Sequence, residues 1–185
     1  GTQLTAMVVT GFALGYFADA WLGTRPIFMF VFGCLGFIGS YVTSSCLDKG
    51  WQVFGVDSCT YAANLDVLDH FKEFENFRFS SANICDLKSL YDCDYIINTA
   101  AETHVDNSIA CSDEFIRSNI DGVHNLLRLI QTRHRFKMPQ LVHFSTDEVY
   151  GDIMSGSFTE TQLMQPSNPY SATKASADML ITAWH

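Results

Sequence analysis

Two short segments near the end of the chain hold side chains that together suit acid–base chemistry. In the first, an apolar run stops and Thr146, Asp147 and Glu148 follow, so a hydroxyl and two carboxylates stand where a buried strand is expected to end. In the second, Tyr170 and Lys174 lie four residues apart at the start of an expected helix, which places them on one helix face. Because an ammonium beside a phenol favours the phenolate, the pair predicts a tyrosine that acts as a base nearer neutral pH.

Composition restricts the partners of this site. The chain has 185 residues, of which 48% are hydrophobic and 14% aromatic, so it is long and apolar enough for one domain with a sizeable core. The formal charge of -9 argues against nucleic acid or an anionic membrane surface as partner, whereas a nucleotide ligand can still bind to backbone amides. Six scattered cysteines without paired spacing predict reduced thiols in a cytoplasmic protein and no metal site.

The first 26 residues form an apolar leader that differs in character from the rest. Between Leu4 and Leu22 the only charge is Asp19, and a second apolar run covers residues 26–42. Each run approaches the roughly 20 residues that a bilayer span needs, so any membrane association would occur through residues 1–42. Through Gly11, Gly15 and the stretch over residues 15–26, residues 1–31 resemble a small membrane protein associated with bacterial ATP synthase. We weigh a fusion or membrane segment against a buried or artefactual leader.

The second apolar run also fits the start of a soluble domain that spans residues 27–185. Its pattern predicts a strand over residues 27–32, a glycine turn over 33–40, a helix over 41–49 and a second strand over 51–56 that ends at Asp57. Strand, glycine turn, helix, strand and acid follow one another in the order of a dinucleotide-binding unit. A buried parallel strand also has continuous apolar sequence, so hydropathy alone does not separate it from a membrane segment.

The glycines and the acid have defined tasks in such a unit. Gly33, Gly36 and Gly39 would let the backbone turn tightly, approach a pyrophosphate and pack the helix against the strand, while the helix N-terminus presents free N–H groups. Asp57 follows about eighteen residues after Gly39 and is placed to accept hydrogen bonds from a ribose diol. An acid at this position favours NAD over NADP, whose extra phosphate it would repel.

The remaining pattern completes an α/β fold. Strands are predicted over residues 77–82, 95–99 and 140–145, with a long amphipathic helix over 112–133 and a loop over 152–169 that covers the site. Alternating strands and helices predict a Rossmann-like, doubly wound parallel sheet. Since the carboxyl ends of parallel strands share one edge, the candidate residues are expected to meet there.

From about residue 28 onward, the chain resembles the extended short-chain dehydrogenase/reductase superfamily, and within it the dTDP-glucose 4,6-dehydratases. The segments that carry the resemblance are Gly33 to Ser40, Asp57 with Thr60 to Asn64, Ala100 to Ser108, Ser145 to Gly151 and Tyr170 to Lys174. The Thr-Asp-Glu triplet is the discriminating part, because the epimerases of the superfamily usually lack that carboxylate pair.

The resemblance implies a role for each catalytic candidate. Tyr170, assisted by Lys174, would remove the proton of a sugar 4-hydroxyl while NAD takes the hydride. Glu148 would then take the C5 proton, and Asp147 would protonate the departing 6-hydroxyl. Thr146 would hydrogen-bond the 4-hydroxyl. Hydride return to C6 would regenerate NAD, and full-length members of the family would form homodimers.

By the same resemblance, Thr103 would also lie near the nucleotide-sugar substrate. Besides the glycines, Tyr170 and Lys174, the NAD-lining residues would be Phe37, Ile38, Asp57, Ser58, Cys59, Thr60, Asn83, Ile84, Ala100, Ala101 and Ser118.

Three departures from the family pattern bear on these expectations. The family usually has Thr-Gly-Gly where this chain has Phe32, Gly33 and Cys34, and usually an acid where Asn83 stands. The chain also stops at His185, inside the last expected helix, so the fold is expected to be incomplete at its C-terminus and to lack the substrate-binding part. This polypeptide alone is therefore expected to have little or no activity. The alternatives are a UDP-sugar dehydratase or epimerase, or a non-catalytic NAD-binding module with a membrane-anchoring leader.

Overall fold

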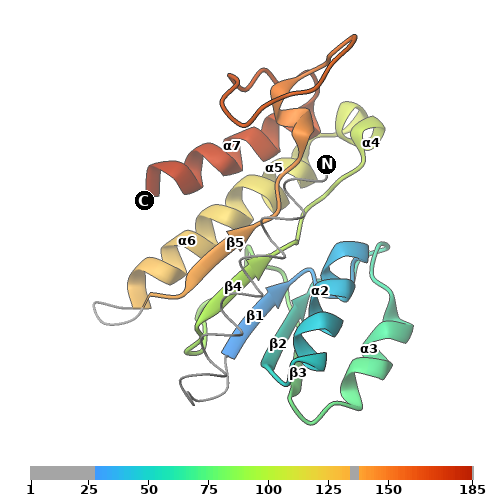
Figure 1. Ribbon diagram of the computed structural model, residues 1–185, viewed down its shortest axis with the longest axis vertical. Coiled ribbons are helices and arrows are strands. Elements are labelled where there is room, and N and C mark those ends of the chain that lie inside the picture. The colour runs from blue at the N-terminus through green and yellow to red at the C-terminus, as the bar shows by residue number, and fades with distance from the viewer. Residues whose placement is uncertain (1–27, 134–137, 185) are drawn as a thin grey trace.

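The computed structural model describes residues 28–133 and 138–184, which form a parallel five-stranded sheet flanked by helices (Figure 1). The strand order is β3-β2-β1-β4-β5, and every pairing between neighbours is parallel. This order confirms the predicted Rossmann-like sheet. The strands are β1 (Phe28–Phe32), β2 (Gln52–Asp57), β3 (Phe77–Ser81), β4 (Tyr95–Asn98) and β5 (Gln140–His143).

The helices occupy most of the connections between these strands. They are α2 (Phe37–Asp48), α3 (Leu65–Lys72), α4 (Val105–Ala110), α5 (Asp113–Ile116), the π-helical turn η1 (Arg117–Asp121), α6 (Gly122–Arg133), the 3-10 turn η2 (Asp147–Tyr150) and α7 (Pro169–Trp184). The expected helix over residues 112–133 is present, with the π-helical turn inserted in it. Helix α2 begins four residues earlier than the predicted residue 41, so the last glycine of the turn already belongs to the helix.

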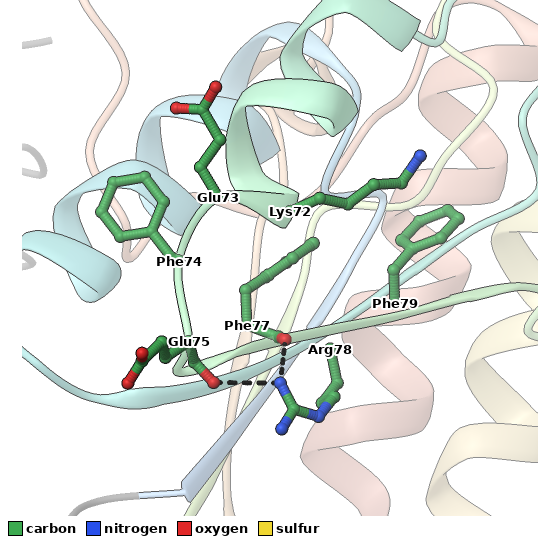
Figure 2. Close-up of a pocket in the computed structure, with 7 residues that line it drawn as sticks. All are labelled: Lys72, Glu73, Phe74, Glu75, Phe77, Arg78 and Phe79. Carbon is green, nitrogen blue, oxygen red and sulfur yellow. Dashed lines mark hydrogen bonds between the residues drawn. The ribbon is translucent and has the colours of Figure 1, made fainter.

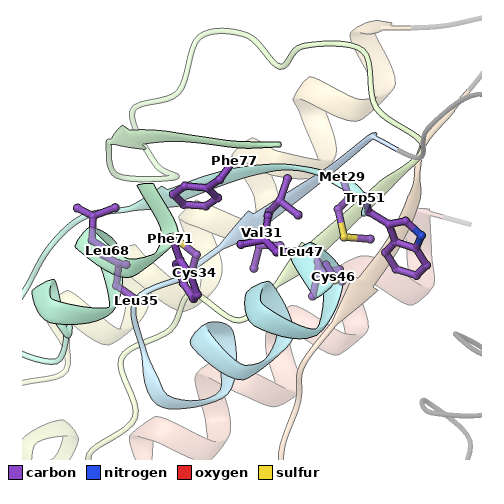
Figure 3. Packing of buried hydrophobic residues seen from close by; sticks show 12 residues of the cluster. Met29, Val31, Cys34, Leu35, Cys46, Leu47, Trp51, Leu68, Phe71 and Phe77 are labelled. Atoms are coloured by element: carbon purple, nitrogen blue, oxygen red, sulfur yellow. The ribbon is translucent and has the colours of Figure 1, made fainter. Parts of the chain in front are cut away.

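Two cores lie on opposite faces of the sheet, because successive side chains of a strand point to opposite sides. Met29 and Val31 of β1 pack with α2 and α3, in the cluster that Figure 3 shows. Phe30 and Phe32 pack on the other face with residues of α6. A smaller cluster joins α6 to α7, which fixes the helix that carries the second candidate segment.

Helix α3 was not predicted, although its sequence holds the signals of a helix. The side chain of Asn64 caps its first turn by accepting a hydrogen bond from the Asp66 N–H at 3.1 Å. Leu68 and Phe71, three residues apart, are buried against the sheet. The cap and this spacing were sufficient to identify the helix.

Residues 28–42 of the second apolar run form strand β1, the glycine turn and the first half of helix α2, as the soluble interpretation predicted. No helix within residues 28–133 and 138–184 is long and apolar enough to cross a bilayer. The predicted leader, residues 1–26, lies outside the described residues, as does Ile27, where the first strand was expected to begin.

Candidate active site

The glycine turn after β1 is tightly packed at two of its three glycines. Gly33 has φ +73°, and a Cβ there would lie 2.7 Å from the backbone nitrogen of Ala100. A Cβ on Gly39 would lie 1.9 Å from the carbonyl oxygen of Gly33. By contrast, a Cβ on Gly36 would meet only that same oxygen, at 3.5 Å. The fold itself requires glycine at the first and third positions, whereas the second leaves open space for another molecule.

Asp57 joins this turn to the loop that follows β2. Its side chain is 8% exposed, and its Oδ2 accepts a hydrogen bond from the Leu35 N–H at 2.9 Å. Its Oδ1 accepts from the Cys59 N–H at 2.8 Å, and Cys59 has a positive φ of 54°. The predicted ribose-binding carboxylate is thus also a structural clamp, which sequence reasoning did not foresee. Each carboxylate oxygen has a second lone pair with which it can accept from a ligand.

A cleft lies at the carboxyl edge of the sheet, which we call the carboxyl-edge cleft. Ten predicted cofactor residues line it: Gly33, Gly36, Asp57, Ser58, Thr60, Asn83, Ile84, Ala100, Ala101 and Ser118. It is also lined by residues that the sequence reasoning missed: Val56, Ala62, Ala63, Ala82, Thr99 and Glu102. Three of these, Val56, Ala82 and Thr99, lie within one residue of the carboxyl end of a strand, so the carboxyl-edge rule could have found them.

The other predicted cofactor residues are not among those that line this cleft: Phe37, Ile38, Gly39, Cys59, Tyr170 and Lys174. Phe37 and Ile38 lie in the first turn of α2 and are 81% and 48% exposed. They border the glycine turn without lining the cleft.

Asn119, in the π-helical turn η1, connects the carboxyl-edge cleft to α7. Its Oδ1 accepts from the Glu102 N–H at 2.9 Å, and its Nδ2 donates to the Glu102 carbonyl at 3.0 Å. The same Nδ2 lies 3.0 Å from Oγ1 of Thr173 in α7. The sequence predicted only the neighbouring Ser118. A π-helical turn inside a longer helix is a frequent mark of a functional site, but its position is not readable from periodicity.

The Thr-Asp-Glu triplet forms the entry to η2, directly beyond β5. Thr146 caps this turn by accepting from the Glu148 N–H at 3.3 Å. The Glu148 carboxylate is partly buried and accepts from Nδ2 of Asn168 at 3.2 Å, while Asp147 is exposed. The two carboxylates therefore have different surroundings, as an acid and a base with separate tasks require.

Tyr170 lies at the start of α7 and is 8% exposed. Burial raises the pKa of its phenol, and the charges of Glu148 and Asp147 raise it further, whereas a hydrogen bond with Thr146 acts in the opposite direction. The structure thus brings the triplet and the tyrosine together. The expected lowering of the Tyr170 pKa by Lys174 is not found: burial is the largest influence and raises this pKa, and Lys174 is not among the groups that act on the phenol.

Lys174, one helical turn further along α7, is 3% exposed and contacts β5 and the residue after it. Its Nζ donates to the carbonyl of Phe144 and lies 3.4 Å from Nε2 of His143. Burial lowers the pKa of Lys174 to about 8, against the opposing charge of Asp178. The i,i+4 spacing correctly placed Tyr170 and Lys174 on one helix face, but the amine of Lys174 contacts His143 at the end of β5 and Phe144 directly after it.

Thr103, predicted to lie near the substrate, is exposed in the loop before α4 and does not line the carboxyl-edge cleft. The next residue, His104, is also exposed, and its ring centroid lies 6.4 Å from that of Tyr61.

A second hollow lies away from the candidate residues, where α3 ends and β3 begins (Figure 2). It is lined by two cationic residues: Lys72 donates from Nζ to Asp69 at 2.9 Å, and Arg78 donates from Nη1 to the carbonyls of Glu75 at 2.9 Å and Phe77 at 2.7 Å. Because both cationic groups already have protein partners and the predicted residues lie elsewhere, this hollow is not part of the candidate site.

The sheet order, the glycine turn, the acid at the end of β2 and the Tyr-x-x-x-Lys helix are those of an extended short-chain dehydrogenase/reductase. Residues 30–185 match the family model of GDP-mannose 4,6 dehydratase, and the chain belongs to that family.

Known relatives agree with this assignment. The chain is 40% identical to a dTDP-glucose 4,6-dehydratase of Streptomyces niveus over 165 residues, covering 84% of this chain and 48% of that protein. It is 41% identical to a dTDP-glucose 4,6-dehydratase of Neisseria meningitidis, again covering 83% of this chain and 48% of that protein. The chain thus spans about half the length of the curated relatives that it matches.

Solved structures show the same relationship. A dTDP-glucose 4,6-dehydratase from Streptomyces venezuelae, crystallised with NAD and a second ligand, superposes with a TM-score of 0.80 at 36% identity, covering 86% of this chain and 52% of that one. A UDP-glucuronic acid 4-epimerase from Bacillus cereus, also solved with NAD, superposes with a TM-score of 0.79 at 26% identity, covering 86% and 52%.

The N-terminal part of the chain matches a second, different family model. Residues 1–43 match a family model described as "Putative F0F1-ATPase subunit Ca2+/Mg2+ transporter", which agrees with the resemblance found in the sequence. This match overlaps the dehydratase match at residues 30–43. In the structure these shared residues belong to β1, the glycine turn and α2 of the Rossmann-like unit.

Proposed function

We propose that residues 27–185 are the NAD-binding, catalytic part of a nucleotide-sugar 4,6-dehydratase that acts on dTDP-glucose. The observation that carries this proposal is the meeting of Thr146, Asp147 and Glu148 with the buried phenol of Tyr170. These groups lie beyond β5, and Asn119 links their helix to the carboxyl-edge cleft. Residues with acid, base and hydroxyl chemistry are thus connected, through Thr173 and Asn119, to a cleft suited to a nucleotide.

The residues of the carboxyl-edge cleft fit NAD. Gly36 leaves a space beside the N-terminus of α2 that a side chain would fill, which suits a phosphate held by backbone N–H groups. Asp57 has free lone pairs for a ribose diol, and Ser58, Thr60 and Asn83 offer further polar groups. When bound, NAD would supply the hydride acceptor that a transient oxidation needs.

The side chains of η2 and α7 would carry the proton transfers. Tyr170 would take the proton of the sugar 4-hydroxyl, which Thr146 would hold by a hydrogen bond. Glu148, fixed by Asn168, would remove the C5 proton that a 4-keto group makes acidic. Asp147, on the exposed side of the turn, would protonate the departing 6-hydroxyl. Elimination of water needs both a base and an acid, and two carboxylates supply this pair.

The experiment uses Glu148→Gln, with Glu160→Gln as the matched control, because Glu160 is an exposed carboxylate in the loop before α7. Since the chain spans about half of its relatives, both variants are made in a chimera that adds the C-terminal half of the Streptomyces niveus enzyme. NAD reduction is followed at 340 nm, and loss of water from dTDP-glucose by mass spectrometry.

The expected result is that the unmodified chimera and the control release water from the sugar. Glu148→Gln should still reduce NAD but should eliminate water at least a hundredfold more slowly, because the C5 base is lost. A chimera that binds NAD and interconverts UDP-sugar epimers would favour the epimerase alternative. NAD binding without any sugar chemistry would favour a non-catalytic module, and no NAD binding by the folded chain would refute the proposal.

A further inference from the structure

His143 belongs to a buried polar chain that runs from the end of β4 to α7. Asn98, the last residue of β4, is 1% exposed, and its Nδ2 lies 3.0 Å from Nδ1 of His143. On the other side of the ring, Nε2 lies 3.4 Å from Nζ of Lys174. The imidazole thus lies between the amide nitrogen of Asn98 and the amine of Lys174, and each contact depends on which ring nitrogen carries the proton.

The backbone fixes the direction of these hydrogen bonds. Oδ1 of Asn98 accepts from the Ala100 N–H at 3.3 Å, so the amide nitrogen must be the atom that faces the ring. An amide nitrogen only donates, and therefore Nδ1 of His143 accepts. Burial, together with the charge of Lys174, lowers the pKa of His143 to about 3, so the ring is neutral at physiological pH. A neutral imidazole carries one proton, which is then on Nε2.

An Nε2–H group that points at a lysine distinguishes between its two protonation states. An ammonium has three donors and no lone pair, so it cannot accept this hydrogen bond, whereas an uncharged amine can. We propose that His143, oriented by Asn98, is a positioning residue that donates Nε2–H to the amine of Lys174 and so favours its uncharged form. The remaining amine hydrogens can still bond to the carbonyl of Phe144.

The titratable groups near Lys174 and its neighbour Tyr170 come from three elements, and Asp178 is the charge that acts on Lys174 itself. Asp178, in the next turn of α7, favours the ammonium, whereas burial favours the amine. From η2, Asp147 and Glu148 act on Tyr170, and from β5 the facing titratable group is His143. The inference rests on the proposed function only for the use of the amine, which would be to accept a proton from the acid–base site.

The test measures the pKa of Lys174 in the full 185-residue chain by competitive acetylation and mass spectrometry, before and after His143→Phe. Phenylalanine keeps the ring and removes the donor, so we expect the pKa of Lys174 to rise by about one unit, a tenfold change in its protonation equilibrium. If the lysine instead donates to the imidazole, the pKa falls. If the ring only packs, the pKa stays unchanged or falls with the added apolar surface. Either of these results would overturn the proposal.

His124→Phe is the matched control, because the ring of His124 in α6 lies 5.9 Å from that of Trp184, at the far end of the helix α7 that carries Lys174. It should leave the pKa of Lys174 unchanged. Should His143→Phe fail to fold, 15N NMR of the unmodified chain reads the ring directly, and a proton on Nδ1 would overturn the proposal. NAD binding is measured in parallel. If the chain does not bind NAD but the pKa of Lys174 rises in His143→Phe, only the proposed function is refuted. If the chain binds NAD but the pKa of Lys174 does not rise, only the role of His143 is refuted.

Discussion

Replacement of Gly36 by alanine tests whether a ligand approaches the glycine turn. Gly36 has φ −72° and ψ 170°, an extended conformation that any residue can adopt. An added Cβ would meet only the Gly33 carbonyl oxygen, at 3.5 Å, an ordinary contact. The fold should therefore accept Gly36→Ala, and the methyl group should project into the carboxyl-edge cleft.

The expected change in stability is small because two effects oppose one another. Alanine is a poorer helix N-cap than glycine by roughly 0.5–1 kcal/mol, and it gains about 0.4–1 kcal/mol by restricting the unfolded chain. The net change should lie within about 0.5 kcal/mol, or about 2 °C in Tm for a chain of this size. If the pyrophosphate of NAD lies against this backbone, the methyl group should weaken binding at least about tenfold, or roughly 1.4 kcal/mol.

Gly33→Ala is the matched comparison within the same turn. Its φ of +73° disfavours alanine, and the new Cβ would lie 2.7 Å from the Ala100 nitrogen. We expect a loss of about 2–4 kcal/mol of stability from strain and overpacking. Calorimetry with NAD and thermal unfolding are measured on both variants. An unchanged Kd in Gly36→Ala would refute close approach of the ligand, and early melting of that variant would refute the packing argument.

Two further predictions concern buried titratable groups. Asp57→Asn should lower the free energy of unfolding by about 1–3 kcal/mol in urea titrations, because one amide group cannot accept from both the Leu35 and the Cys59 N–H. An unchanged free energy of unfolding would contradict the structural role of these two hydrogen bonds. The pKa of Lys174 is about 8 when folded and ordinarily 10.5, so the unfolded chain binds more protons between these values and stability rises with pH there. Relative to Lys174→Met, the wild type should gain about 3 kcal/mol from pH 8 to pH 10.5 in denaturant titrations, and a flat difference would contradict this burial.

The sequence was sufficient for the features that depend on local pattern. Strand β1 and Gly33 were predicted because an apolar run and a turn glycine are both visible in a few neighbouring residues. The second bonding role of Asp57 was not predictable, because its partner Leu35 lies 22 residues away and meets it only in the folded chain. Asn119 was missed for the same reason, since its bonds to Glu102 span 17 residues and depend on a π-helical turn.

The helix spacing of Tyr170 and Lys174 was read correctly, but the direction of the tyrosine pKa was not. Spacing gives the face of a helix, whereas a pKa depends on burial and on charges that other elements bring near. Here η2 brings Asp147 and Glu148 to the phenol, and both carboxylates oppose its ionisation.

This opposition links the acid and base tasks of the proposed dehydration. A carboxylate raises the pKa of Tyr170 only while it is charged, so a proton on Asp147 removes part of the barrier to forming the phenolate. The protonated form of Asp147 is also the form that could donate to a leaving hydroxyl. One proton on Asp147 would therefore make Asp147 ready to act as the acid and would ease ionisation of Tyr170. Glu148 would stay charged and able to accept the C5 proton. In Asp147→Asn, which is permanently neutral, the pKa of Tyr170 should fall while water elimination is lost, a combination that a purely structural role for Asp147 would not produce.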